Sequence, residues 1–153
     1  MRNFLFTLVA FGFGCGGDTK FVGEEEDTGS AALVCEGAPE VDHDEFDESQ
    51  PGGVSVTIDT VVIGDPTPGC EHVKPRTVYL HYKKWNADEY KAPLQMATLD
   101  DVNFSVTIPK ADVASSKMLY YFQAVGPTKE TTEPDGPKED GKNTFEFVID
   151  SGL

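Results

Sequence analysis

Hydrophobic and polar residues alternate with a period of two through much of the chain after residue 50. Val54, Val56 and Ile58 alternate with small polar residues, and this period is typical of a β-strand that buries one face. Similar alternation, or a dense apolar run, predicts strands in five further segments: 78–84, 91–97, 104–108, 118–125 and 145–150. Helical periodicity is weak and favours a single turn, at 111–117.

Short polar turns separate these segments, for example at 64–66 and 140–141. Many short strands joined by such turns indicate an all-β fold, and we predict one antiparallel β-sandwich domain in residues 51–153. We expect its core to contain six aromatic residues: Tyr82, Phe104, Tyr120, Phe122, Phe145 and Phe147.

The N-terminus has the features of a secretory signal peptide. A short basic start precedes the mostly apolar run 4–13, and small residues follow it from Gly14. Ten residues reach only about 15 Å as a helix, half of a bilayer core of roughly 30 Å, so the run is too short to span a membrane. We therefore assign 1–14 to a signal peptide that is removed from the mature protein.

Cys15 stands at the expected cleavage position and is followed by two glycines. This arrangement resembles the lipobox of bacterial lipoproteins, in which the cysteine is acylated and becomes the new N-terminus. Gly14 fits the position before the cysteine, whereas Phe13 and Gly12 depart from the usual residues. The resemblance implies a lipid anchor at Cys15 and a place in the cell envelope, at the outer membrane. Ordinary secretion with Cys15 lost or free, and a misplaced start codon, are the alternatives.

Negative charge is concentrated between the signal peptide and the strands. The chain has a net charge of −15, and segment 15–50 contributes 12 acidic residues against one basic residue, Lys20. This segment has few large apolar residues with which to offset its chain entropy, so we expect a mostly disordered acidic tether. The charge argues against nucleic acid as a partner, because phosphate binding needs clustered lysine and arginine.

Three cysteines in an exported chain leave one unpaired unless it has another role. If Cys15 is acylated, Cys35 and Cys70 remain, and in an oxidising compartment we expect them to form a disulfide. Closing the loop between them would stabilise the fold by roughly 4 kcal/mol in the chain-entropy model. A metal site of Cys35, Cys70 and His72 is the alternative, although a second ligand pair at the usual spacing is lacking.

The order of motifs in the strand region is also informative. Strand 77–83 is followed by a short strand carrying a methionine, 94–96, then by a strand that ends in Ile-Pro at 108–109 and by an aromatic strand that ends in alanine, 119–124. This order resembles the immunoglobulin-like or fibronectin type III-like modules of bacterial extracellular proteins. The resemblance implies an Ig-like sandwich but no particular activity, because such modules serve as spacers, adhesive surfaces or enzyme appendages.

Two acidic segments are candidate calcium sites. The run 42–48 alternates carboxylates as a Ca²⁺ loop does, yet it lacks the glycine and the final glutamate that an EF-hand needs, so a solvated linker is the simpler interpretation. The connection 126–143 is long, rich in proline and charged, and loops of this length are functional or mobile. Within it, Asp135, Asp140 and Asn143 could gather around a weakly bound Ca²⁺; an ordinary exposed loop is the alternative.

Aromatic residues are the clearest candidates for a ligand-binding surface. Trp85, the only tryptophan, follows strand 78–84 and stands close to Tyr90, while Tyr79 and Tyr121 alternate with the expected core residues of their strands. Sugar-binding modules present such rings on an outer face, whereas the alternative for Trp85 is packing at the end of the core. A ring that is more than half exposed beside other aromatic residues favours ligand binding, and a buried ring favours packing.

The sequence contains no recognisable catalytic motif. The three histidines lie outside any His-Glu-x-x-His pattern, and neither a nucleophile elbow nor a phosphate loop occurs. We therefore expect a non-enzymatic cell-envelope lipoprotein that displays one sandwich for structural or interaction purposes and needs no cofactor. The alternative is a carbohydrate- or calcium-dependent binding module that uses the exposed aromatic residues and the 126–143 loop. An accessory subunit that pairs with another protein through a sheet edge is a third possibility.

Overall fold

The computed structural model describes residues 32–114, 116–138 and 142–150. These residues form strands and turns without a helix, and so none of them belongs to a helix that could cross a membrane. The strands are β1 (Glu40–Asp42), β2 (Gln50–Pro51), β3 (Val56–Ile63), β4 (Thr77–Lys84), β5 (Leu94–Gln95), β6 (Ala97–Thr98), β7 (Asn103–Ile108), β8 (Lys117–Val125), β9 (Glu130–Glu133) and β10 (Phe145–Asp150). The prediction of an all-β fold is confirmed.

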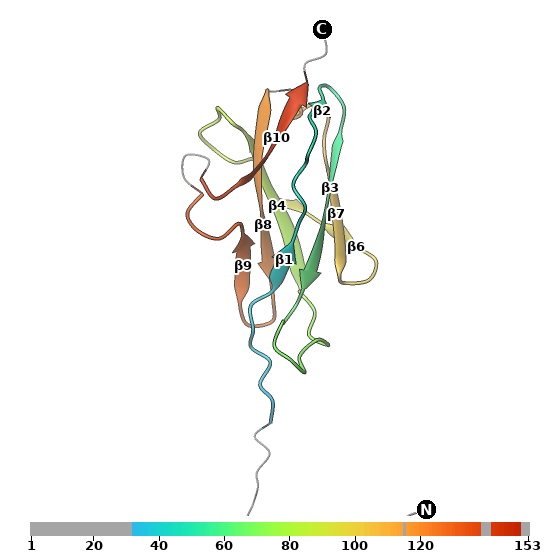
Figure 1. Ribbon diagram of the computed structural model, residues 1–153, viewed down its shortest axis with the longest axis vertical. Helices are drawn as coiled ribbons and strands as arrows, with labels where there is room; N and C mark the ends of the chain where they lie inside the picture. Colours follow the sequence, from blue (N-terminus) through green and yellow to red (C-terminus); the bar gives the residue numbers. More distant parts are fainter. Residues whose placement is uncertain (1–31, 115, 139–141, 151–153) are drawn as a thin grey trace, which may run out of the picture. The chain divides into compact units, whose positions relative to one another are not determined.

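Two sheets enclose one hydrophobic core (Figure 1). The four-stranded sheet has the order β1-β3-β7-β6, and the six-stranded sheet has the order β2-β10-β8-β4-β5, with β9 also paired to β8. The pairs are antiparallel except for β2 and β10, which run parallel. The expectation of a wholly antiparallel sandwich is therefore wrong at this one edge, because the chain before β3 adds a short strand beside the last strand.

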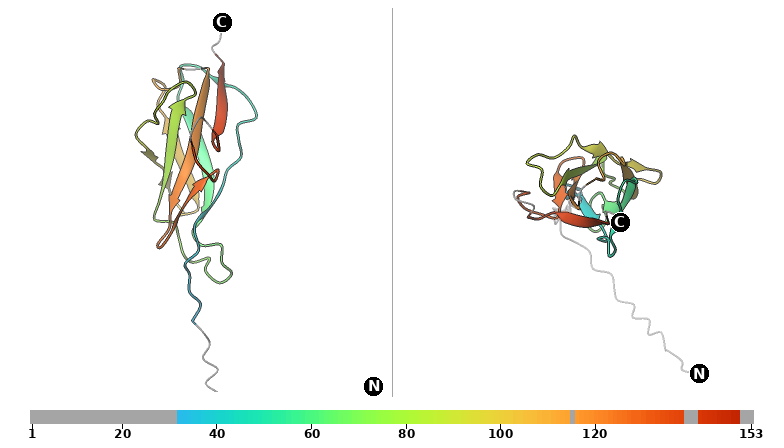
Figure 2. Two further views of the ribbon diagram at one scale, coloured as in Figure 1. Left: turned by 90° about the vertical axis from the view of Figure 1, so that its left-hand side faces the viewer. Right: turned by 90° about the horizontal axis from the view of Figure 1, so that it is seen from above.

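Side-chain alternation decides which residues reach the core. Buried and exposed residues alternate strictly along both β3 and β10. The six aromatic residues expected in the core are all buried, with exposed fractions between 0% and 8%. They come from both sheets, and seen end-on in Figure 2 the strands surround the interior that these rings fill. Full burial of one such side chain contributes roughly 1.5–3 kcal/mol, so these rings account for much of the stability.

The segment expected as one strand at 91–97 is instead two short strands in different sheets. Leu94 and Gln95 pair with β4, whereas Ala97 and Thr98 pair with β7. Between them, Met96 is buried and its amide donates a hydrogen bond to the carbonyl of Val78 (2.9 Å). The chain crosses from one sheet to the other at this methionine, a change of partner that local alternation does not reveal.

The folded domain begins before Pro51, the boundary expected from composition. Strand β1 pairs with β3, and Val41 lies opposite Val62 in the core. Farther along, Phe46 packs against the core rings of Tyr120 and Phe147. The tether prediction was therefore wrong for residues 40–50, because a few apolar side chains at the right spacing suffice when their acidic neighbours face outward. Cys15 and the rest of 1–31 lie outside the described residues.

The expected loop 126–143 contains a further strand. Strand β9 pairs with the end of β8 at 122–125, and β10 pairs with the beginning of β8 at 117–120. Because β4 occupies the other edge of β8, both strands lie on the same side of β8, one after the other, and the chain between them leaves the sheet and returns. The polar sequence of β9 lacks alternation, which is why its pattern did not predict a strand. The helical turn expected at 111–117 is a simple turn in which the Asp112 amide donates to the Pro109 carbonyl.

The predicted disulfide between Cys35 and Cys70 is confirmed, with a Cα–Cα distance of 5.5 Å. Beside it, the buried Asp65 carboxylate accepts hydrogen bonds from the amides of Gly37 (2.8 Å) and Thr67 (2.9 Å). These contacts fasten the chain before β1 to the β3–β4 connection. Because a metal binds the thiolate and both sulfurs are in the disulfide, the alternative metal site with His72 is not supported.

Candidate ligand-binding cleft

The outer face of the six-stranded sheet carries one row of residues that departs from simple alternation. The strand registers place Lys83 of β4, Leu119 of β8 and Glu146 of β10 side by side across the sheet. Residues on this face should be solvent-exposed, yet Lys83 is only 7% exposed and Leu119 only 6%. Their burial means that other parts of the chain cover this end of the face.

Two connections provide the cover. The β4–β5 connection brings Trp85 and Tyr90, and the segment between β9 and β10 brings Lys138. The first connection is held down at Lys91, whose amide donates to the Tyr82 carbonyl (2.9 Å) and whose ammonium pairs with Asp112 (3.1 Å). Its other end is held where the Trp85 amide donates to the Lys117 carbonyl (3.1 Å).

Between these walls lies a cleft with a volume of about 700 Å³. We call it the aromatic-lysine cleft, and its lining residues are Lys83, Trp85, Asn86, Ala87, Asp88, Tyr90, Lys117, Leu119, Lys138 and Glu146. Trp85 is 55% exposed, so its ring is available to a ligand rather than packed into the core. An accessible ring beside a few polar groups is a common arrangement in small-molecule sites.

The four aromatic residues singled out in the sequence lie in different places on this face. Trp85 and Tyr90 line the cleft. Tyr121 lies next to it, with its ring 5.1 Å from that of Tyr90 in an edge contact and 4.4 Å from that of His81 in a parallel stack. Tyr79 lies farther along β4, opposite Gln123 and Gln95, and is not part of the lining. The structure thus brings three of the four together.

The ammonium groups of two cleft lysines lie over aromatic rings, and neither forms an ion pair with a carboxylate among the described residues. The ammonium of Lys83 lies 5.0 Å from the centre of the Tyr90 ring, and that of Lys138 lies 5.2 Å from the centre of the Tyr121 ring. Lys117, in contrast, forms an ion pair with Glu146 at 2.9 Å. Such cation–π contacts contribute about 0.5–1 kcal/mol at exposed sites and more where water is excluded.

Two polar atoms of the cleft are buried without a hydrogen-bond partner among the described residues, the hydroxyl oxygen of Tyr90 and the Nζ atom of Lys138. Burial lowers the pKa of the Lys138 ammonium, while the Asp135 and Glu133 carboxylates act in the opposite direction. Burial also raises the pKa of the Tyr90 hydroxyl, which therefore stays protonated and able to donate. Sequence patterns did not single out Lys83 or Lys138, because a lysine at the protein surface is usually solvated.

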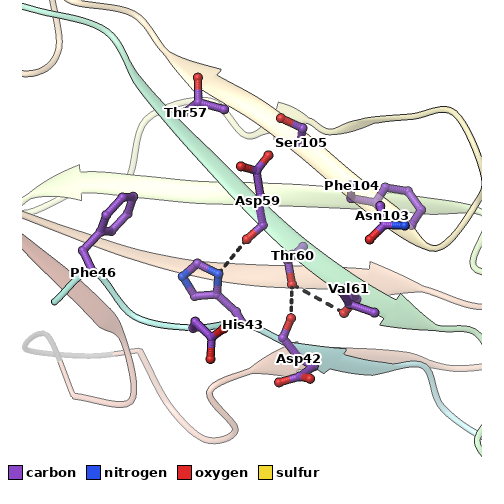
Figure 3. A pocket seen from close by; sticks show the side chains of 11 residues that line it. Asp42, His43, Phe46, Thr57, Asp59, Thr60, Val61, Asn103, Phe104 and Ser105 are labelled. Carbon is purple, nitrogen blue, oxygen red and sulfur yellow. Dashed lines mark hydrogen bonds between the residues drawn. The ribbon is translucent and has the colours of Figure 1, made fainter.

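A second pocket, about 500 Å³ in volume, lies between the chain after β1 and the outer face of β3 and β7 (Figure 3). Its centre is His43, whose Nδ1 lies 2.7 Å from the Asp59 carbonyl oxygen and whose Nε2 lies 2.8 Å from the Tyr120 hydroxyl. Since a carbonyl oxygen only accepts, Nδ1 carries the proton and Nε2 accepts from Tyr120. Burial lowers the pKa of His43, against the opposing influence of the Asp59 carbonyl and nearby carboxylates.

Two of the carboxylates around this pocket do not converge on a common point. Those of Asp42 and Asp59 point to opposite sides in Figure 3, and Asp42 belongs to strand β1. The acidic run 42–48 leads from β1 in the four-stranded sheet toward β2 in the six-stranded sheet. The hydrogen bond between His43 and Tyr120 attaches this run to the core.

The predicted calcium ligands of the 126–143 connection are only partly described. The side-chain amide of Asn143 donates to the Pro137 carbonyl (3.0 Å), so it fastens the returning chain to itself. Asp140 lies outside the described residues, and Asp135 remains a predicted ligand.

Comparisons with known proteins add little to this picture. No protein-family model and no curated protein matches the sequence. The crystal structure of an engineered protein aligns with 73% of this chain and 20% of that chain, with a TM-score of 0.48 and 12% sequence identity. This chain therefore spans about a fifth of that protein's length, and a likeness this weak carries no argument about family or function.

Proposed function

We propose that this protein is an exported, non-enzymatic binding module that displays an Ig-like sandwich and takes a glycan in the aromatic-lysine cleft. The strand order supports the fold assignment: β1-β3-β7-β6 corresponds to the A-B-E-D sheet of immunoglobulin domains, and β10-β8-β4 corresponds to the G-F-C sheet. The fold alone is compatible with many roles, so the function has to be argued from the cleft.

The observation that carries the proposal is the exposure of Trp85. At 55% exposed and lining a cleft with Tyr90, the ring favours ligand binding over packing at the end of the core. Both walls of the cleft are fastened, at Lys91 on one side and through Asn143 on the other. A preformed site of this kind lowers the entropic cost of binding. The flat face of a pyranose ring fits against an indole in the way that apolar rings stack in binding sites.

The experiment is a glycan-array screen of the purified full-length protein, the Trp85→Ala variant and a matched control, Leu99→Ala. Leu99 is also a large exposed apolar residue, 106% exposed, but it lies outside the cleft. We expect Trp85→Ala to weaken binding about tenfold or more, as truncation of a central aromatic residue does, and Leu99→Ala to leave it unchanged. Equal binding by all three proteins, or the absence of any glycan ligand, contradicts the proposal.

The proposed place of the protein is the cell envelope, with acylated Cys15 as the lipid anchor. A single acyl chain binds a membrane only marginally, and two or more hold a protein firmly. In a bacterial host, Cys15→Ala should therefore move the protein from the membrane fraction to the soluble fraction. A Cys15→Ala protein that still requires detergent for extraction contradicts the lipid anchor. That result would not bear on the proposed glycan site in the cleft.

A further inference from the structure

The charge of the aromatic-lysine cleft is opposite to that of the chain. Its lining holds three lysines against Asp88 and Glu146, in a protein with a net charge of −15. Glu146 is already bonded through both oxygens to Lys117, at 2.9 Å each. Lys83 and Lys138 remain, and within the described ranges 32–114, 116–138 and 142–150 neither ammonium forms an ion pair.

From this arrangement we infer that the ligand is an anionic glycan, whose carboxylate or sulfate group binds between Lys83 and Lys138 while a sugar ring stacks on Trp85. This inference rests on the proposed function and narrows it to a class of ligand. The same two anionic groups occur on uronic acids and on sulfated sugars, and the lysines would bind either through charge-assisted hydrogen bonds.

Burial of the Lys138 ammonium is the first supporting observation. Its Nζ atom is covered and has no hydrogen-bond partner among the described residues, so the flexible lysine side chain has to turn toward the cleft to meet an anion. An unpaired buried charge is costly. The Tyr121 ring 5.2 Å away and the Asp135 and Glu133 carboxylates, neither of which forms an ion pair with Lys138, offset only part of that cost. An anionic group in the cleft would supply the missing partner, as a buried ion pair requires.

The second observation is the Tyr90 hydroxyl, a buried donor that also lacks a partner among the described residues. The Tyr90 ring lies 5.0 Å from the Lys83 ammonium and makes a T-shaped contact with the Tyr121 ring, so two neighbours fix its position. A neutral ligand would leave two ammonium groups unpaired in a partly dehydrated cleft, and a ligand without a ring would leave the indole uncovered. An acidic sugar would pair the ammonium groups through its anionic group and would cover the indole with its ring.

The single tryptophan makes the test direct, because the emission of Trp85 reports on the cleft itself. The full-length protein is titrated at low and high salt with four probes: polygalacturonate, dextran sulfate, neutral dextran and single-stranded DNA. We expect a fluorescence change with one or both acidic glycans that weakens as salt rises, and none with dextran or DNA. Binding of polygalacturonate alone identifies the carboxylate, and binding of dextran sulfate alone identifies the sulfate.

Substitutions locate the binding. Lys138→Gln should weaken binding of the acidic glycan about tenfold or more, the usual effect of losing a hydrogen bond to a charged group. Lys83→Gln should act similarly, with its melting temperature measured in parallel because Lys83 is 7% exposed and packs on Tyr90. Lys110→Gln is the matched control, since Lys110 is an exposed lysine on the β7–β8 connection outside the cleft.

The outcomes separate the inference from the proposed function. Equal binding of neutral and acidic glycans, lost in Trp85→Ala but not in Lys138→Gln, overturns the anionic ligand and keeps the glycan site. Binding of DNA as tight as that of the acidic glycans overturns the assignment to a sugar. No fluorescence change with any probe, together with an array that finds no ligand, overturns both proposals.

Discussion

The outer faces of the two sheets are built by the same alternation and yet are chemically unlike. On the four-stranded sheet, the outward positions of β3 and β7 hold polar and acidic residues such as Thr57, Asp59 and Ser105, and β3 adds the exposed aliphatic residues Val61 and Ile63. The Thr57 and Thr107 hydroxyl groups form a hydrogen bond across the strands at 3.0 Å. On the six-stranded sheet, the outward positions of β4 and β8 hold rings and cations, with Tyr121 stacked on His81.

This difference indicates that the residues specific to function lie at outward positions of the sheets rather than in the core. The inward positions of both sheets hold equivalent apolar side chains that serve one core, and apolar residues of similar volume could replace them. Residues at outward positions do not pack in the core, so a cluster of rings and lysines there requires a separate explanation. The connections that cover one end of the six-stranded sheet turn that cluster into a cleft.

Adjacent residues of β8 give the largest expected contrast. Phe122 is fully buried in the core, whereas Tyr121 faces outward and is half-buried. We expect Phe122→Ala to lower the free energy of unfolding by about 3–5 kcal/mol, through lost burial and a cavity, and Tyr121→Ala to lower it by about 1 kcal/mol. Urea unfolding of the two variants measures both values, and similar losses would contradict the assignment of inner and outer faces.

Loss of the disulfide should have the next largest effect on stability. This disulfide joins the chain before β1 to the connection between β3 and β4, two strands that lie in different sheets. Replacing Cys35 and Cys70 by serine together should lower the free energy of unfolding by about 2–4 kcal/mol, because the unfolded chain regains the entropy of the closed loop. Urea unfolding in the presence and absence of reductant provides the measurement. The wild-type protein with reductant should match the double variant, and a double variant as stable as the oxidised protein would show that this link contributes nothing.

His43 gives a smaller effect, which depends on pH. Its folded pKa lies below the usual 6.5 because of burial, so below pH 6.5 the unfolded chain takes up a proton that the folded protein resists. Stability is therefore highest above pH 6.5 and falls as the pH decreases toward the folded pKa. The urea midpoint of the wild-type protein should be lower at pH 5.5 than at pH 7.5. His43→Gln should show a smaller difference between the two pH values, and an unchanged difference would assign the effect to other groups.

Much of the fold could be predicted because its determinants are local. Val56 to Ile63, Phe145 to Asp150 and the buried rings of β8 follow a period of two that can be read directly from the chain. The disulfide was predictable from the number of cysteines and the expected compartment. In contrast, β9 has no apolar periodicity, and β1 occupies only three residues of an acidic segment. Their strands form because β8 and β3 offer unpaired edges.

The candidate site was predictable only in part, for the same reason. Trp85 and Tyr90 were recognisable as aromatic residues near a turn. Lys83 and Lys138 were not, because their role depends on which rings lie beneath them and on which connections exclude water. Neither condition is visible from residue type or spacing.

By itself, then, the sequence determined where the main strands run, which side chains form the core and which cysteines join. Only the tertiary structure decided that the chain changes sheets at Met96 and that residues 55 positions apart, Lys83 and Lys138, line one cleft. The physical reason is that side-chain alternation is set by neighbouring residues, whereas pairing, burial of charge and the shape of a surface depend on segments that meet only after folding.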